Sequence, residues 1–201
     1  MSEINQTKKI VFIGNSIFKG YPYAESESLV SQYREATGYD VVNRGVNGDT
    51  IGGMASRFLH DVLLERPDKV AFLAGTNEFI FNVQGVKSCF EDLKVLVNVA
   101  QERGIEPILV TPISVVPEMA RVSWADGDEI DYDKVQLQIE EFRDMLIAYG
   151  KENDLQVVDF FAEYKTFTEK VGETGAFLDG IHPTRDGYKV LAEVAISEIK
   201  F

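Results

Sequence analysis

The chain has little of what anchors or cross-links proteins outside the cell. Cysteine occurs once, as Cys89, so an internal disulfide is excluded and a reducing compartment is expected. No apolar run reaches the ~20 residues of a membrane-spanning helix. The polar start, MSEINQTKK, lacks the apolar region of a signal peptide. We therefore expect a cytoplasmic protein without a membrane partner.

Positive charge is also scarce. Lysine and arginine number 20 against 33 acidic residues, which gives a net charge of −13. Nucleic acids and anionic membrane surfaces are bound through basic patches, so neither is expected as a partner. Hydrophobic residues make up 45% of the chain, enough for a real core. With no repeat and no long linker, we expect one domain over residues 1–201.

Short apolar runs alternate with longer helical patterns along the chain. Near-continuous apolar runs such as KVAFLA are typical of strands that are covered on both faces. The alternation predicts an α/β fold with a parallel sheet and helices on both faces. Residues 114–132 have no clear period and form a long connection, of a kind that often shapes binding sites. The predicted strands are Lys9–Ile13, Asp40–Asn43, Lys69–Ala74, Pro107–Thr111 and Gln156–Phe160, and the predicted helices are Ala24–Thr37, Met54–Leu64, Val86–Arg103, Asp133–Asn153 and Arg185–Ile199.

Histidine occurs only twice, which narrows the choice of a general base. His60 lies within a helical pattern, where a surface or packed residue is the expected interpretation. His182 lies in the loop DGIHPT, three residues after Asp179. A carboxylate at that spacing can accept the Nδ1 proton and leave Nε2 free as a base. The same loop is equally compatible with a cap for the final helix.

The first strand ends in VFIGNSIFKG, where Ser16 permits three interpretations. It fits a turn leading to a helix N-cap, a phosphate-binding loop, or a nucleophile. The phosphate loop is disfavoured because the segment has neither a Walker nor a G-x-G-x-x-G pattern. As a nucleophile, Ser16 would have its own N–H near a developing oxyanion, and His182 could serve as its base.

Two further residues follow strands at the same predicted rim. Gly48 in NRGVNGDT can bring a backbone N–H close to a substrate, and Asn77 in GTNE can supply a side-chain amide. Together with Ser16 they would complete an oxyanion site. Taken singly, each is more typical of a turn, an N-cap or an Asx-turn.

Taken together, this order of motifs resembles the SGNH hydrolase family, also called GDSL-type esterases and lipases. GNS, NRGVNGDT, GTNE and DGIHPT match the family's blocks from Ser16 to His182, so the resemblance spans the chain. It implies a flavodoxin-like three-layer α/β/α sandwich with a five-stranded parallel sheet. It also implies Ser16 as nucleophile, His182 as base and Asp179 as the acid that orients it. The N–H groups of Ser16 and Gly48 and the Asn77 side chain would be the oxyanion donors.

Two positions depart from the family's usual pattern. Asn15 stands where the first block usually has aspartate, and Glu78 where the third block usually has aspartate. Neither is a member of the implied triad or a donor to the oxyanion. The amide of Asn15 changes the charge beside Ser16.

The predicted activity is hydrolysis of short-chain acyl or acetyl esters by a serine esterase without cofactor or metal. The acidic stretch at 126–133 fails the spacing of a calcium loop. Lysophospholipids and acyl thioesters are alternative substrates within the family. A nucleotide- or flavin-binding module and a non-catalytic carbohydrate-binding protein are alternatives of other classes. The aromatic residues Trp124, Tyr21, Tyr23 and Phe79 either form a substrate wall or simply pack in the core.

Overall fold

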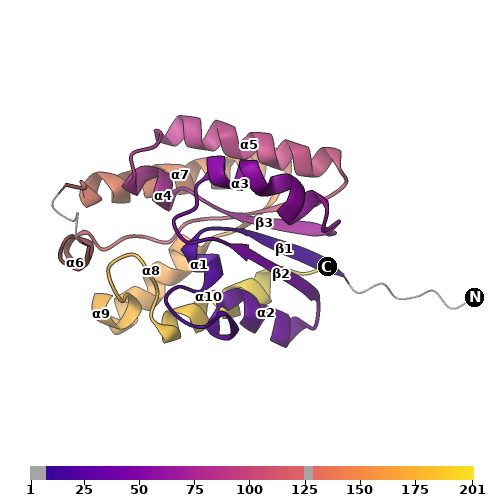
Figure 1. The fold of residues 1–201 in the computed structure, drawn as a ribbon. Coiled ribbons are helices and arrows are strands. Elements are labelled where there is room, and N and C mark those ends of the chain that lie inside the picture. Colours follow the sequence, from indigo (N-terminus) through magenta and orange to yellow (C-terminus); the bar gives the residue numbers. More distant parts are fainter. Residues whose placement is uncertain (1–7, 125–128) are drawn as a thin grey trace, which may run out of the picture.

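A five-stranded parallel sheet forms the centre of the protein in a computed structural model, which describes residues 8–124 and 129–201. Every neighbouring pair of strands is parallel, and helices cover both faces (Figure 1). This confirms the predicted α/β/α sandwich, and the strand order is that of flavodoxin-like folds. In sheet order the strands are β2 (Asp40–Gly45), β1 (Lys9–Gly14), β3 (Lys69–Leu73), β4 (Glu106–Val110) and β5 (Gln156–Val158).

The helices are divided between the two faces of the sheet. Side chains of β1 alternate between them: Val11 and Ile13 pack into one apolar cluster, and Ile10 and Phe12 into the other. The first cluster is covered by α3 (Ile51–Phe58), α4 (Thr76–Ile80), α5 (Val86–Glu102) and α7 (Tyr132–Asn153). The second is covered by α1 (Ser16–Lys19), α2 (Leu29–Thr37), α8 (Phe160–Val171), α9 (Glu173–Ala176) and α10 (Arg185–Glu198).

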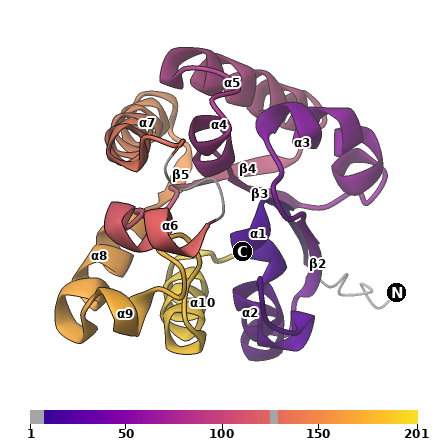
Figure 2. The ribbon, with the colours of Figure 1, turned by 60° about the vertical axis from the view of Figure 1, so that its left-hand side comes forward.

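The position of the site follows from the strand order. The chain passes from β1 to β2 on one side and returns to β3 on the other, so β1 marks the point where the winding reverses. Ligands of open parallel sheets bind beyond the carboxyl ends of strands at such a point. The helices α1, α4 and α6 (Pro117–Ser123) lie around this end of the sheet (Figure 2).

Several predicted boundaries of strands and helices are wrong. The fifth strand ends at Val158, because the Asp159 side chain accepts a hydrogen bond from the Ala162 N–H (3.2 Å) and caps α8. The helices α8 and α9 separate this strand from the loop that carries His182. Periodicity missed α8 because its first residues continue an apolar run.

Two other segments also differ from their predictions. The predicted helix from Ala24 contains a short 3₁₀ turn, Glu25–Glu27, and then restarts as α2 with Ser28 as its N-cap. The segment 114–132, expected to lack regular structure, contains α6, which begins with proline at its first turn. The predicted helix Met54–Leu64 is present as α3 followed by a π-helical turn, Leu59–Leu63.

Within residues 8–124 and 129–201, no helix combines the length and apolarity needed to cross a membrane. Residues 125–128, which include the start of the acidic stretch at 126–133, lie outside the described part of the chain. Among the residues that the structure describes, no group of three or more His, Cys, Asp or Glu side chains is arranged to hold a metal ion.

Candidate active site

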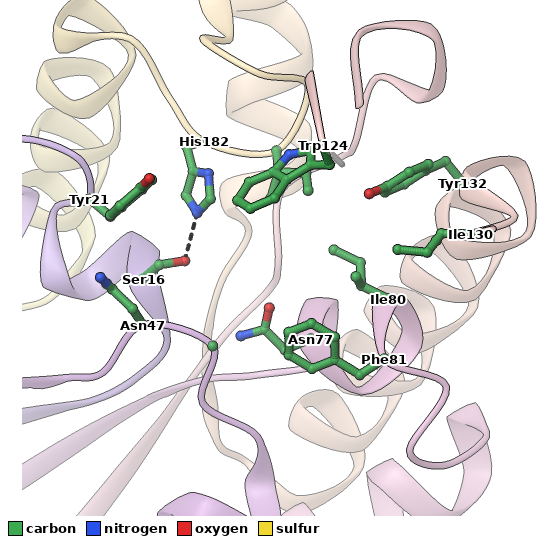
Figure 3. A pocket seen from close by; sticks show the side chains of 12 residues that line it. Ser16, Tyr21, Asn47, Asn77, Ile80, Phe81, Trp124, Ile130, Tyr132 and His182 are labelled. Atoms are coloured by element: carbon green, nitrogen blue, oxygen red, sulfur yellow. Dashed lines mark hydrogen bonds between the residues drawn. The ribbon is translucent and has the colours of Figure 1, made fainter. Parts of the chain in front are cut away.

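Ser16, His182 and Asp179 form a hydrogen-bonded chain at the carboxyl end of the sheet. Figure 3 shows the contact between Ser16 and His182. The Ser16 Oγ lies 2.9 Å from His182 Nε2, and His182 Nδ1 lies 2.8 Å from Asp179 Oδ2. The two ring nitrogens thus face different partners, as the spacing of the DGIHPT loop predicted. Ser16 and His182 are each 6% exposed, so their contact is nearly dry.

The loop that carries His182 is held by its own backbone. Asp179 Oδ1 accepts hydrogen bonds from the N–H groups of Ile181 (2.9 Å) and His182 (2.8 Å), while Oδ2 faces the ring. Leu178 N–H donates to the His182 carbonyl (2.9 Å), and a β-bridge joins the two ends of the loop. The imidazole therefore has little freedom to turn away from Ser16.

Gly180 lets this loop dock on α6. Its φ is +84°, and a Cβ there would lie 2.5 Å from Ala120 N. The Val116 N–H donates to the Gly180 carbonyl (2.8 Å), which fixes the start of α6 against the loop. Only glycine meets both conditions without displacing backbone.

The electrostatics of Asp179 favour a carboxylate beside the ring. Burial raises the pKa of Asp179, but the hydrogen bond and charge of His182 and the two backbone N–H donors outweigh it. The net pKa is lowered, so the side chain is ionised at neutral pH. An ionised Asp179 accepts the Nδ1 proton and leaves Nε2 as an acceptor for the Ser16 hydroxyl.

Ser16 stands at the first position of α1, directly after β1. Asn15 is the N-cap, and its Oδ1 accepts a hydrogen bond from the Ile17 N–H (3.0 Å). An aspartate at this position could make the same bond, so the departure from the family's pattern keeps the cap and removes a charge. The Ser16 N–H is in the first turn, where no intrahelical acceptor is available.

Gly48 and Asn77, which come from different segments of the chain, line the same cavity as Ser16. Gly48 adopts a φ of +73° and lines the cavity with Asn77. The Asn77 Nδ2 donates to the Asp49 backbone carbonyl (2.8 Å). The Arg57 Nη2 donates to Oδ2 of the Asp49 carboxylate (2.5 Å). The loop of Gly48 and the first turn of α4 are thus bound to each other.

Glu78 makes a second tie between the same two segments, which sequence reasoning did not foresee. Its side chain is fully buried and accepts hydrogen bonds from the N–H groups of Ile51 (2.5 Å) and Gly75 (3.0 Å). Burial raises the pKa of Glu78, and the backbone donors only partly offset this. In the sequence, the only signal for this role was the position of Glu78 next to the predicted donor Asn77, and that position did not identify the groups that Glu78 binds.

A cavity of about 500 Å³ opens beside these residues (Figure 3). Trp124 and Tyr21 line it, with ring centroids 5.9 and 4.7 Å from that of His182. Tyr23 and Phe79 do not: Tyr23 packs on Tyr188, and Phe79 is buried in the core. Two of the four aromatic candidates therefore form a wall and two pack.

The remaining lining residues were missed because each becomes part of the wall only through the fold. Ile80 and Phe81 lie three and four residues after Asn77, the spacing that places side chains on one face of a helix. In the sequence, that spacing and the position of Ile181 next to His182 were the signals that could have identified residues of the wall. His60 is exposed and lies outside this cavity, in agreement with its prediction as an ordinary helical residue. The full lining is Ser16, Tyr21, Asn47, Gly48, Asn77, Ile80, Phe81, Trp124, Ile130, Tyr132, Ile181 and His182.

The chain matches a known protein family over most of its length. The sequence pattern of the GDSL-like Lipase/Acylhydrolase family matches residues 12–190, which include all the motifs described above. The chain belongs to this family. As a family member, it is a carboxylic ester hydrolase.

Individual relatives cover nearly the whole chain. The acetylxylan esterase of Geobacillus stearothermophilus is 22% identical over 224 residues, which span 99% of this chain and 97% of the relative. A solved G-D-S-L family structure from Desulfitobacterium hafniense DCB-2 superposes with a TM-score of 0.77 at 28% identity, covering 96% and 99% of the two chains. The lipase/acylhydrolase of Enterococcus faecalis shares the fold with a TM-score of 0.76 at 24% identity, over 96% and 95%.

Proposed function

We propose that this GDSL-family member hydrolyses short-chain acyl or acetyl esters, with Ser16 as the nucleophile, His182 as the base and Asp179 as the orienting acid. The observation that carries the proposal is the continuous chain of contacts from Ser16 Oγ to Asp179 Oδ2 at the wall of a cavity. A serine hydroxyl is a weak nucleophile unless an oriented base takes its proton.

The reaction proceeds in two acyl-transfer steps. Ser16 Oγ attacks the ester carbonyl carbon while His182 Nε2 takes its proton, and the resulting imidazolium is stabilised by Asp179. The tetrahedral intermediate collapses as His182 returns the proton to the leaving alcohol. Water then attacks the acyl-enzyme with His182 again as base, which releases the carboxylic acid and restores Ser16. None of these steps uses a metal or a cofactor.

The proposed donors to the oxyanion are the N–H groups of Ser16 and Gly48 and the side-chain amide of Asn77. All three residues line the same cavity, which supports this assignment. Asn77 is 8% exposed, and donors in such a water-poor place stabilise charge more strongly than donors in bulk water. The hydrogen bond from Asn77 to the Asp49 carbonyl holds the amide in advance, so little reorganisation accompanies the reaction.

A phosphate-binding loop at 15–20 fits the observed contacts less well. The Ile17 N–H, which such a loop would direct at a phosphate, is occupied by Asn15 Oδ1. The Lys19 ammonium pairs with Glu25 (3.7 Å). A nucleotide site would also give no role to the Asp179–His182 pair.

A panel of p-nitrophenyl esters from acetate to decanoate tests the proposal on the wild type and Ser16→Ala. Labelling with a fluorophosphonate followed by peptide mapping locates the nucleophile. We expect hydrolysis and labelling at Ser16 in the wild type, and neither in Ser16→Ala. An inert and unlabelled wild type, or a fully active Ser16→Ala, would refute the assignment.

A further inference from the structure

The cavity beside Ser16 is too large for an acetyl group alone. At about 500 Å³ it falls in the range of pockets that enclose drug-sized ligands. Its size therefore bears on which acyl group the substrate carries.

The geometry of attack, which rests on the proposed function, divides the cavity in two. In the tetrahedral intermediate the oxyanion faces Gly48 and Asn77, and the leaving oxygen must lie within reach of His182 Nε2. The leaving group is thus directed to the part near the His182 ring, which Tyr21 and Trp124 flank. The acyl group takes the remaining direction, away from Ser16.

The wall in that direction is apolar. Ile80 and Phe81 come from α4 and the residue after it, and Ile130 faces them from just before α7 (Figure 3). Phe81 is 55% exposed, so part of this large apolar side chain faces solvent at the cavity. None of the described residues that line the cavity is a lysine, an arginine or an acid, so a charged acyl group would find no counter-ion there.

We propose that the acyl half of the site binds an unbranched alkanoyl chain longer than acetyl, in contact with Ile80, Phe81 and Ile130. Such a chain would remove both its own surface and the exposed part of Phe81 from water. The relative from Geobacillus stearothermophilus is an acetylxylan esterase, and the proposal distinguishes this chain from it in acyl preference.

A second cavity limits the chain length. Ile80 and Ile130 also line an adjoining hollow of about 220 Å³, so the apolar wall continues past the first cavity. Glu129, Asp131 and Lys134 line that hollow as well. A longer alkyl chain would meet these charges, and its methylenes would no longer displace water from apolar surface.

Chain-length profiles of kcat/KM test the proposal. We expect kcat/KM for p-nitrophenyl esters to rise about fourfold per added methylene from acetate to hexanoate, the factor expected for burying one methylene. It should then fall by decanoate. The double variant Phe81→Ala/Ile130→Ala should lower the ratio of hexanoate to acetate kcat/KM at least tenfold. Leu137→Ala, which removes an exposed apolar side chain of α7 outside the cavity, is the matched control and should keep the wild-type profile.

The ratio of hexanoate to acetate hydrolysis is the decisive quantity, because partial unfolding lowers both rates alike. A profile that falls from acetate onward, or a double variant with an unchanged ratio, overturns the acyl site while ester hydrolysis stands. Binding of free hexanoate and acetate to Ser16→Ala, measured by calorimetry, needs no turnover. Tighter binding of hexanoate is expected, and equal affinities would overturn the inference even if the proposed hydrolysis also failed.

Discussion

Replacement of Asn77 by alanine tests the proposed side-chain donor to the oxyanion. Removing one oxyanion donor costs about 2.7–4 kcal/mol of transition-state stabilisation in another serine hydrolase, or roughly 10²–10³ in kcat. Asn77 is buried and already fixed by its bond to the Asp49 carbonyl, so we expect the full effect here. Since the amide meets the oxyanion only as charge develops, kcat should fall much more than KM rises.

The same change also removes a structural hydrogen bond, and this cost can be measured separately. Losing the bond to Asp49 should destabilise the fold by about 0.5–1.5 kcal/mol, a shift in Tm of a few degrees at most for a chain of this size. Steady-state kinetics at saturating p-nitrophenyl butyrate would be compared with thermal unfolding of the same preparation. Asn153→Ala, which removes an exposed amide from the end of α7, is the control.

The isosteric variant Asn77→Asp separates donation from size. It keeps the shape of the side chain but replaces the amide donor with a carboxylate oxygen, so kcat should fall at least as far as in the alanine variant. A kcat within about threefold of wild type in either variant, or a change confined to KM, would show that Asn77 binds substrate and does not stabilise the oxyanion.

Three further changes probe the neighbours of the triad. Asp179→Asn should lower kcat by roughly 10⁴, because an amide favours the wrong tautomer of the His182 ring. Since the pKa of Asp179 is lowered in the folded protein, its ionised carboxylate should stabilise the fold fully above pH 3.8, and this stabilisation should be lost as the pH falls further. Acid unfolding of the wild type and the variant would measure it. Glu78→Gln places an amide against backbone donors and should lower the free energy of unfolding by about 1–3 kcal/mol. Because the pKa of Glu78 is raised in the folded protein, this loss of stability, measured by denaturant unfolding, should be greatest below pH 4.5 and shrink as the pH rises. A loss that does not change with pH would contradict the burial argument. Asn15→Asp keeps an acceptor for the Ile17 N–H, so Tm should hardly change, and a loss of several degrees in thermal unfolding would contradict the N-cap argument.

The fold could be predicted from the sequence because buried parallel strands leave a strong local signal. The apolar runs around Val11, Phe72 and Leu109 are too continuous for any element exposed on one face. Alternation with helical periods then sets the class of fold. The boundary at Asp159 was not predictable from periodicity, because an N-cap that ends an apolar run changes the backbone without changing the hydrophobic pattern.

The positions of the polar site residues were likewise present in the sequence. Ser16, Gly48 and Asn77 each follow a predicted strand, and the rule that such ends share one rim brings them together. Asp179 and His182 are three residues apart, so their pairing is a local property of one loop. Motif and spacing therefore determined which groups form the candidate machinery.

The tertiary structure alone decided how those groups are supported and what they face. Glu78 ties two segments by accepting from Ile51 and Gly75, and a buried acceptor cannot be assigned to its donors before the chain is folded. The wall formed by Phe81 and Ile130 arises from elements about 50 residues apart, whose side chains meet only through packing. Strand order and motif spacing thus fix the chemistry near Ser16, whereas long-range packing fixes the volume and polarity of the space that a substrate enters.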